Sequence, residues 1–249
     1  MSRFVRTPAF VLKTSNYSET SLIVTLYTLK EGRVQCIGKG ARRPKSPFAG
    51  MLESLNEIEV VYIQGRSELY TLKECSMLRS RMGLREDLAN IRSALQVLAV
   101  VEETQTLSDP HPEVFTLMEE CLDAIEERSD PGRVVLFFHT KLLEVSGYAP
   151  DYSMCALCGS RLGKRAGYNP MQNGFICLRC GSENESHGVS AGTMEILRRF
   201  QKVTLSAARR IKLSATQQKE AEGLFSLMFQ SILERKSDAG RILDSMGGP

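Results

Sequence analysis

The chain has no tryptophan, few aromatic residues and no long apolar run, and these absences narrow the classes of protein it can belong to. Aromatic residues make up 7% of its 249 residues, so few rings are available to stack on nucleic-acid bases. No apolar run approaches the roughly 20 residues that cross a bilayer. The first residues, Met1 to Arg6, lack the apolar stretch of a secretory signal. We therefore expect a cytoplasmic protein that does not act at a membrane.

Recognisable catalytic motifs are missing as well. The sequence contains no phosphate-binding Gly-x-x-x-x-Gly-Lys-Ser/Thr loop, no dinucleotide fingerprint and no metal-binding pair of carboxylates. Its three histidines, His111, His139 and His187, lie far apart, and none has a nucleophile close by in the sequence. His139 falls in an apolar segment and is best explained as a hydrogen-bonded core residue. We predict that the protein is not an enzyme.

Four of the seven cysteines form two pairs, Cys155-Ala-Leu-Cys158 and Cys177-Leu-Arg-Cys180, with 18 residues between them. This spacing is typical of a two-knuckle zinc site. A glycine follows each pair, and four thiolates would complete a closed tetrahedron with no position for substrate. We predict one structural zinc ion per chain. A redox dithiol, an iron–sulfur ligand set and two disulfides are the alternatives, and His187 is expected to be a bystander.

The remaining cysteines, Cys36, Cys75 and Cys121, are isolated within apolar patterns and are expected to be small buried hydrophobes. An odd number of cysteines with free thiols fits a reducing cytoplasm.

Charge is distributed unevenly along the chain. Residues 1–81 hold 13 Lys and Arg against 7 Asp and Glu, and residues 154–249 hold 14 against 8. Residues 82–153 between them hold 5 against 14. A basic–acidic–basic chain indicates modules with different electrostatic roles and makes a polyanion a plausible partner. Ordinary variation in surface charge is the alternative.

The first 81 residues have the pattern of a small β-barrel. Short β-branched and apolar runs alternate with polar turns, one of them at Thr14–Asn16. Five strands are predicted, at 9–12, 22–29, 34–37, 57–63 and 69–72. This number and spacing favour a partly open barrel of OB type, and an SH3-like barrel or a small sandwich are the alternatives.

After Met77 the apolar period becomes helical. We predict helices at 84–101, 114–125, 131–147, 190–200 and 215–234, with Asp130 capping the third and Ser190 the fourth. The third helix, apolar on every side at Val134–Phe138, should be central and buried. We expect an OB-fold domain at 1–81, a helical domain at 82–153 and 189–249, and an inserted zinc ribbon at 154–188. The tail from Gly240 is expected to fray.

One loop carries a strong signal for binding an anion. Gly38 to Ser46 contains four cations within seven positions, Lys39, Arg42, Arg43 and Lys45, together with two glycines. Cations beside flexible backbone suit phosphate oxygens. Arg3, Arg6 and Arg33 would extend this patch if the strands place them on the same face, and a solvated hairpin is the alternative. Candidates for base stacking are Tyr17, Phe48, Tyr27 and Tyr62, of which the last two are more easily explained as core.

The order of these parts resembles that of the bacterial RecO family of recombination and repair mediators. Three motifs carry the resemblance. They are the basic loop Lys39–Ser46 within the predicted strands, the segment Glu68–Leu72 on a late strand, and Leu142–Pro150 followed directly by Cys155-x-x-Cys158-Gly. It covers essentially the whole chain. The cysteine pairs occur in many unrelated ribbons, whereas the basic loop and the Gly-Tyr-x-Pro lead into the first knuckle are more specific.

The resemblance implies an α+β protein with an OB-fold domain, a helical domain and an inserted four-cysteine zinc ribbon. It also implies a non-enzymatic, nucleoid-associated role: binding single- and double-stranded DNA, annealing complementary strands, and loading the RecA-type recombinase onto strands coated by single-strand-binding protein. The implied partners are RecR and the C-terminal tail of single-strand-binding protein. By motif match, Lys39, Arg42, Arg43 and Lys45 take the DNA-contact role.

Two other functions fit parts of the sequence. An RNA-binding or ribosome-associated zinc-ribbon protein would explain the charge and the cysteines, but not the acidic helical middle. A nuclease or hydrolase would need a carboxylate or histidine cluster that the sequence does not reveal.

Overall fold

The computed structural model describes residues 3–65, 67–127, 129–181 and 188–246 and forms two compact units, Met1–Arg128 and Ser129–Pro249. The first two long helices therefore belong to the same compact unit as the N-terminal strands. The three-domain organisation that we expect from the sequence, with boundaries near residues 81, 153 and 188, remains a prediction. His187 lies outside the described residues.

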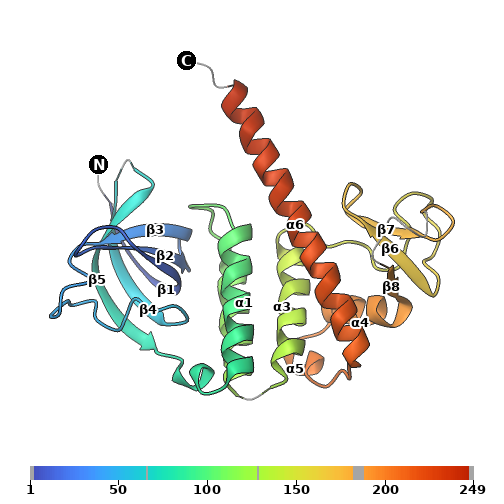
Figure 1. Cartoon of the computed structure of the whole chain (residues 1–249), viewed down its shortest axis with the longest axis horizontal. Coiled ribbons are helices and arrows are strands. Elements are labelled where there is room, and N and C mark those ends of the chain that lie inside the picture. Colours follow the sequence, from blue (N-terminus) through green and yellow to red (C-terminus); the bar gives the residue numbers. More distant parts are fainter. Residues whose placement is uncertain (1–2, 66, 128, 182–187, 247–249) are drawn as a thin grey trace. The chain divides into compact units, whose positions relative to one another are not determined.

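Five strands of the first unit close into a barrel with the order β1-β2-β3-β5-β4 (Figure 1). Strands β3 and β5 are parallel, and the other neighbours are antiparallel. This is the strand order of an OB fold, and it confirms the predicted α+β fold class with its N-terminal OB barrel. The bounds are β1 Arg3–Asn16, β2 Leu22–Thr28, β3 Gly32–Gly38, β4 Glu57–Gln64 and β5 Leu69–Arg79.

Strand β1 is long because it closes the barrel. Its first half pairs with β4 and its second half with β2, and the register shifts between Val11 and Lys13. Thr14 pairs with Val24 and Asn16 with Leu22, so the ladder continues through the segment in which we expect a turn. The predicted turn at Thr14–Asn16 is therefore wrong, and the chain reverses over residues 17–21.

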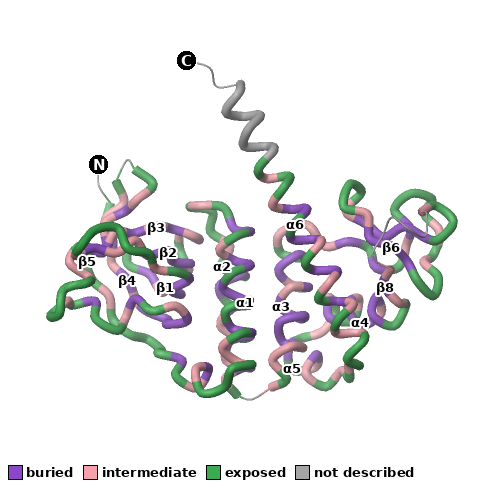
Figure 2. The backbone as a smooth tube through the Cα atoms, viewed as in Figure 1, coloured by how far each residue is buried: buried purple, intermediate pink, exposed green. Residues whose placement is uncertain are grey.

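A short 3-10 helix, η1 (Met82–Arg85), follows the barrel and leads into α1 (Leu88–Thr104) and α2 (Pro112–Glu126). Helix α1 begins later than the apolar period predicts because the Asp87 side chain caps it, accepting hydrogen bonds from the amides of Ala89 and Asn90. Helix α1 packs against β1 and β2. Figure 2 shows buried positions recurring along α1 and the barrel strands.

A buried arginine joins the barrel to α2. The Arg81 side chain is fully buried, forms ion pairs with Glu57 of β4 (3.1 Å) and Asp123 of α2 (2.6 Å), and lies 5.5 Å from the centroid of the Phe10 ring. Burial raises the pKa of Glu57. Burial alone would also raise the pKa of Asp123, but hydrogen bonds from Arg79 and Arg81 lower it.

The described residues of the second unit form four helices and a three-stranded sheet of order β7-β6-β8 (Figure 1). Helix α3 lies at its centre, in contact with the other three helices, and Val134 to Phe138 are all buried, as predicted. The Asp130 carboxylate caps α3 by accepting from the Arg133 amide at 3.2 Å. The bounds are α3 Pro131–Val145, β6 Arg165–Asn169, β7 Gly174–Cys177, β8 Gly188–Ser190, α4 Ala191–Lys202, α5 Leu205–Ala208 and α6 Ala215–Met246.

Two details of the second unit differ from the sequence prediction. Helix α6 continues through Gly240 to Met246, further than the helix predicted over residues 215–234. His139 packs edge-to-face against the rings of Phe225 and Phe229, with centroids 5.2 and 5.0 Å away, but its buried Nδ1 has no hydrogen-bond partner within the described part of the chain. Burial lowers the pKa of His139 to about 3, so the ring is neutral near pH 7.

Candidate nucleic-acid interface and metal centre

The four cations of the basic loop, residues 39–46, lie together at the surface. Lys39, Arg42, Arg43 and Lys45 are all exposed. The loop leaves the end of β3 through a tight turn, in which Gly40 has a φ of 74° and its carbonyl accepts from the Arg43 amide at 3.0 Å. A left-handed φ of this kind favours glycine.

The basic loop is fastened to the turn between β1 and β2. The Arg42 amide donates to the Thr20 carbonyl at 3.0 Å, and its guanidinium donates to the Ser18 carbonyl at 2.9 Å. The segment that follows enters the barrel core through Phe48 and Leu52. The loop therefore presents its cations from a fixed base instead of moving freely in solvent.

The structure separates the four aromatic candidates. Tyr27 and Tyr62 are completely buried and Phe48 is nearly so, as members of the hydrophobic core. Tyr17 is 57% exposed and directly precedes Ser18, whose carbonyl binds Arg42. Tyr17 is thus the candidate ring that is placed beside the cations and available to stack on a base.

Arg3 and Arg6 are engaged by acidic side chains of the barrel. Arg3 pairs with Glu31 at 3.2 Å, and Arg6 pairs with Glu59 at 2.8 Å. Both lie in the half of β1 that pairs with β4, whereas the basic loop contacts the turn that follows its other half. The structure does not bring these two arginines into the loop cluster.

Arg33 is also separate from the basic loop. It lies five residues before Gly38 on β3, a separation of roughly 16 Å along a strand. Its guanidinium donates to the Glu102 carbonyl of α1, and burial lowers its pKa. Arg33 therefore has an internal structural contact.

The four paired cysteines converge on one point. The Sγ atoms of Cys155, Cys158, Cys177 and Cys180 all lie within 4.8 Å of one another, and the Cys158 and Cys177 sulfurs are 3.8 Å apart. Four sulfurs at about 2.3 Å from a central zinc would be about 3.8 Å apart along each edge of the tetrahedron. The donor set fits a tetrahedral metal ion and leaves no open coordination position.

Local backbone geometry explains this convergence. The Gly159 amide donates to the Cys155 carbonyl at 2.9 Å, and Gly159 has a φ of 65°, so glycine is favoured immediately after the first pair. The Cys177 amide points at the Cys155 sulfur, 3.4 Å away. Hydrogen bonds from Ser160 lower the pKa of Cys158 to about 6, which favours the thiolate that a metal binds.

The ribbon that carries the cysteines is attached to the helices of its own unit. The Ala191 amide donates to the Lys164 carbonyl at 2.8 Å, and Asn173 donates to the Tyr148 carbonyl at 3.1 Å. Arg235 of α6 donates to the Pro170 carbonyl.

The prediction that the other three cysteines are small buried hydrophobes is confirmed for Cys36 and Cys121 and only in part for Cys75. Cys36 and Cys121 are buried and Cys75 is partly buried. Burial raises the pKa of Cys36 to about 12 and that of Cys75 to about 11, so these thiols stay protonated near neutral pH.

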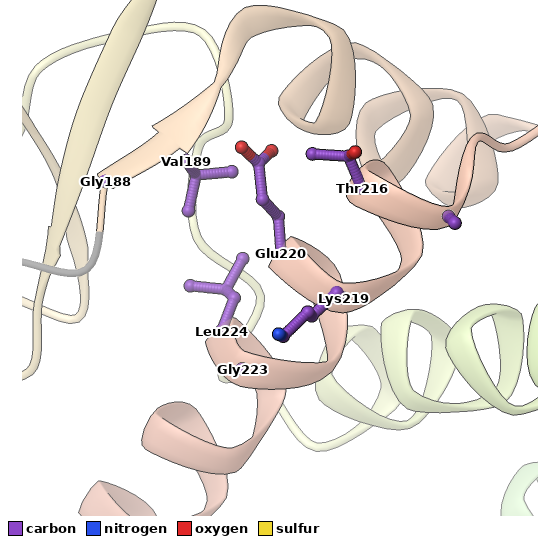
Figure 3. Close-up of a pocket in the computed structure, with 8 residues that line it drawn as sticks. Gly188, Val189, Thr216, Lys219, Glu220, Gly223 and Leu224 are labelled. Carbon is purple, nitrogen blue, oxygen red and sulfur yellow. The ribbon is translucent and has the colours of Figure 1, made fainter.

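A hollow of about 470 Å³ lies between β8 and the first turns of α6 (Figure 3). Its two charged side chains are Lys219 and Glu220. The Glu220 carboxylate accepts from the Ser190 hydroxyl (2.6 Å), the Ser190 amide (3.1 Å) and the Thr193 hydroxyl (2.6 Å). Glu220 thus secures the start of α4, and the residues lining the hollow contain no nucleophile with an adjacent base.

The part of the chain that the structure describes shows neither a second cluster of metal ligands nor a membrane-spanning helix. The four cysteines are the one group of three or more potential metal ligands found there. None of the described helices combines the length and the apolar character needed to cross a membrane.

Comparison with known families agrees with this architecture. The model of the family Recombination protein O N terminal matches residues 1–81, and that of Recombination protein O C terminal matches residues 85–239. The chain belongs to the RecO family. The boundary between the two matches falls near the end of the barrel strands.

Several curated relatives carry the name "DNA repair protein RecO". The protein from Syntrophus aciditrophicus is 29% identical over 97% of this chain and 95% of its own length. The protein from Rubrobacter xylanophilus is 33% identical over 82% of this chain and 83% of its own length, and that from Bacillus subtilis is 29% identical over 95% and 92%. The protein is therefore a RecO-family DNA repair protein.

Proposed function

We propose that this protein is a recombination mediator that binds single- and double-stranded DNA and anneals complementary strands. The observation that carries the proposal is the basic loop, which presents four exposed cations from a fixed base on an OB barrel. OB folds bind single strands through strand faces and loops, with aromatic rings stacking on the bases. Tyr17 supplies such a ring beside Arg42.

The cations act by screening phosphate charge. Lys39, Arg42, Arg43 and Lys45 would contact phosphate oxygens, which carry no information about the base sequence. Two strands whose backbones are screened can approach closely enough for their bases to pair. This mechanism needs neither ATP nor a catalytic group.

The test is a binding and annealing assay with variants of the basic loop. Replacing Arg42 and Arg43 with alanine should weaken binding to all single strands alike, and should flatten the slope of log affinity against log salt by about 1.4, or 0.7 for each lost contact. The variant Tyr17→Ala should weaken binding with little change in the salt slope, since stacking releases few counterions.

A charge-matched control is available in the same unit. Replacing Arg3 and Arg6 with alanine removes the same charge from residues that already pair with Glu31 and Glu59. We expect this control to keep most of its affinity. Equal losses in the two double variants would show that net charge, and not the basic loop, determines binding.

We propose that Cys155, Cys158, Cys177 and Cys180 bind one structural zinc ion, and the separation of their sulfurs supports this. When bound, the ion cross-links the two knuckles and supplies no catalytic position. Elemental analysis of the purified protein should give about one zinc per chain, and Cys158→Ser should lower that content. Iron with a visible charge-transfer band would identify an iron–sulfur centre instead.

The wider role that we propose is to load a RecA-type recombinase onto strands coated by single-strand-binding protein, together with RecR and through the tail of that binding protein, in the bacterial cytoplasm at the nucleoid. We further propose that the protein has no catalytic turnover. Labelled oligonucleotides should be annealed and not cleaved. ATP hydrolysis or strand cleavage that is lost with a point mutation in this chain would contradict the proposal.

A further inference from the structure

The described part of the zinc ribbon carries four cations and no carboxylate side chain. Residues 154–181 contain Arg161, Lys164, Arg165 and Arg179 and no aspartate or glutamate. All four cations are exposed. Four thiolates with a bound zinc ion would carry two negative charges, so residues 154–181 would keep two net positive charges when loaded. Glu183 and Glu185, which follow in the sequence, lie outside the described residues.

Three of these cations lie where the ribbon meets the start of α4. The carbonyl of Lys164 accepts from the Ala191 amide, and Arg165 pairs with Ser190 in the sheet. Arg161 and Arg198 of α4 both line one hollow of about 420 Å³. Arg161 and Arg198, which are far apart in the sequence, thus line the same hollow, and the backbone at Lys164 and Arg165 is joined to the start of α4.

Helix α4 extends this surface away from the ribbon. Lys202 lies four residues beyond Arg198, which places it on the same helix face about 6 Å along the axis. Lys202 is exposed. We call Arg161, Lys164, Arg165, Arg198 and Lys202 the ribbon–α4 surface.

Two acidic side chains lie close to this surface. Glu220 accepts hydrogen bonds from Ser190 and Thr193, and Arg165 contributes to lowering its pKa. Glu195 lines the same hollow as Arg161 and Arg198. Glu195 pairs with Arg198 at 2.7 Å and with Arg199 at 3.0 Å, and these two arginines lower its pKa. The trio keeps one net positive charge. Arg161, Lys164, Arg165 and Lys202 form no ion pair with any residue that the structure describes.

The ribbon–α4 surface differs from the basic loop in one respect. The large apolar side chains exposed in the described part of the second unit are Val145, Leu157, Met171 and Leu178, and none of them is aromatic. The surface therefore offers charge without a ring for base stacking. Bases of a duplex are already stacked on one another, so a duplex presents its backbone and needs no such ring.

We propose that the ribbon–α4 surface binds the phosphate backbone of double-stranded DNA, as a second site separate from the basic loop on the barrel. This inference rests on the proposed function, because it divides DNA binding between the two units of the chain. A protein with one site for a single strand and another for a duplex can hold the annealed product while the barrel engages unpaired bases.

The test uses the full chain with Arg161 and Lys202 both replaced by alanine. Both side chains are exposed and form no ion pair in the described structure, so folding should be unaffected. For a blunt DNA duplex, the slope of log affinity against log salt should flatten by about 1.8, or 0.9 for each lost contact. Affinity and slope for an unstructured single strand should be unchanged.

Two comparisons make the result specific. A variant with Arg92 and Lys219 replaced by alanine removes two exposed helical cations outside both surfaces, and should match the wild type on both probes. For the variant with Arg42 and Arg43 replaced, the slope of log affinity against log salt should instead flatten for the single strand. Duplex binding that falls only with the Arg42 and Arg43 variant would overturn the second site and leave the proposed function intact.

Absence of DNA binding by the wild-type protein would overturn the proposed function itself. A polyglutamate peptide serves as a further probe. If the Arg161 and Lys202 variant loses affinity for this peptide while its duplex slope equals that of the wild type, the surface belongs to an acidic protein partner and the proposal is wrong.

Discussion

The ion pairs of Arg81 give a stability prediction whose size follows from burial. Its side chain is fully buried, and Glu57, one of its partners, has a side chain only 7% exposed. Replacing Arg81 with methionine removes the cation and leaves the Glu57 carboxylate in an apolar setting. The backbone strain is unchanged, because a φ of 46° is equally unfavourable for either side chain.

Removing one partner of a buried pair costs about 3 to 5 kcal/mol. We expect the lower end, about 3 kcal/mol, because Asp123 is 37% exposed and Arg79 remains 3.9 Å from Glu57. A loss of this size corresponds to roughly a hundredfold faster exchange of amides that exchange only on unfolding. Hydrogen–deuterium exchange of peptides from β4 and α2 measures this loss of stability within the first unit.

Arg79→Met is the matched control. Arg79 reaches the same carboxylates, but its side chain is 49% exposed, so its loss should cost no more than about 1 kcal/mol. The double variant Glu57→Gln with Arg81→Met removes both buried charges and should cost less than the two single changes together. Equal effects of Arg79→Met and Arg81→Met on exchange would refute the argument from burial.

Three further predictions concern the second unit. Asp130→Ala should destabilise it by about 1 kcal/mol through loss of the α3 cap, measured by urea unfolding; an unchanged midpoint would count against the cap. Hydrogen bonds from Ser190 and Thr193 outweigh burial and lower the pKa of Glu220, so its stabilising contribution is present above the unfolded pKa of about 4.3 and is lost as pH falls through the folded value. The stability difference between wild type and Glu220→Gln should therefore shrink on acidification, and a constant difference would be contrary evidence. Gly159→Ala should cost about 1 kcal/mol or more and weaken zinc retention against a chelator, because the φ of 65° strains alanine; normal retention would contradict this account of the knuckle.

Local patterns in the sequence were sufficient for much of the architecture. Residue spacing placed the buried stretch of α3, its Asp130 cap and the Ser190 cap of α4, because helix periodicity and capping depend on residues close together in the chain. The cysteine pairs likewise indicated a site whose four sulfurs the structure brings together. The cationic character of residues 39–45 was also plain from the sequence.

Contacts between distant segments were decided only by the tertiary structure. The extension of β1 through Asn16 depends on its pairing with β2. Arg3, Arg6 and Arg33 are cations like Arg42, but ion pairs and burial in the barrel separate them from the basic loop. Tyr17 and Tyr27 are the same residue type, and only the closing of the barrel exposes one ring and buries the other. Sequence determined which chemical groups the protein has, and the long-range packing of strands and helices determined which of them can reach a ligand.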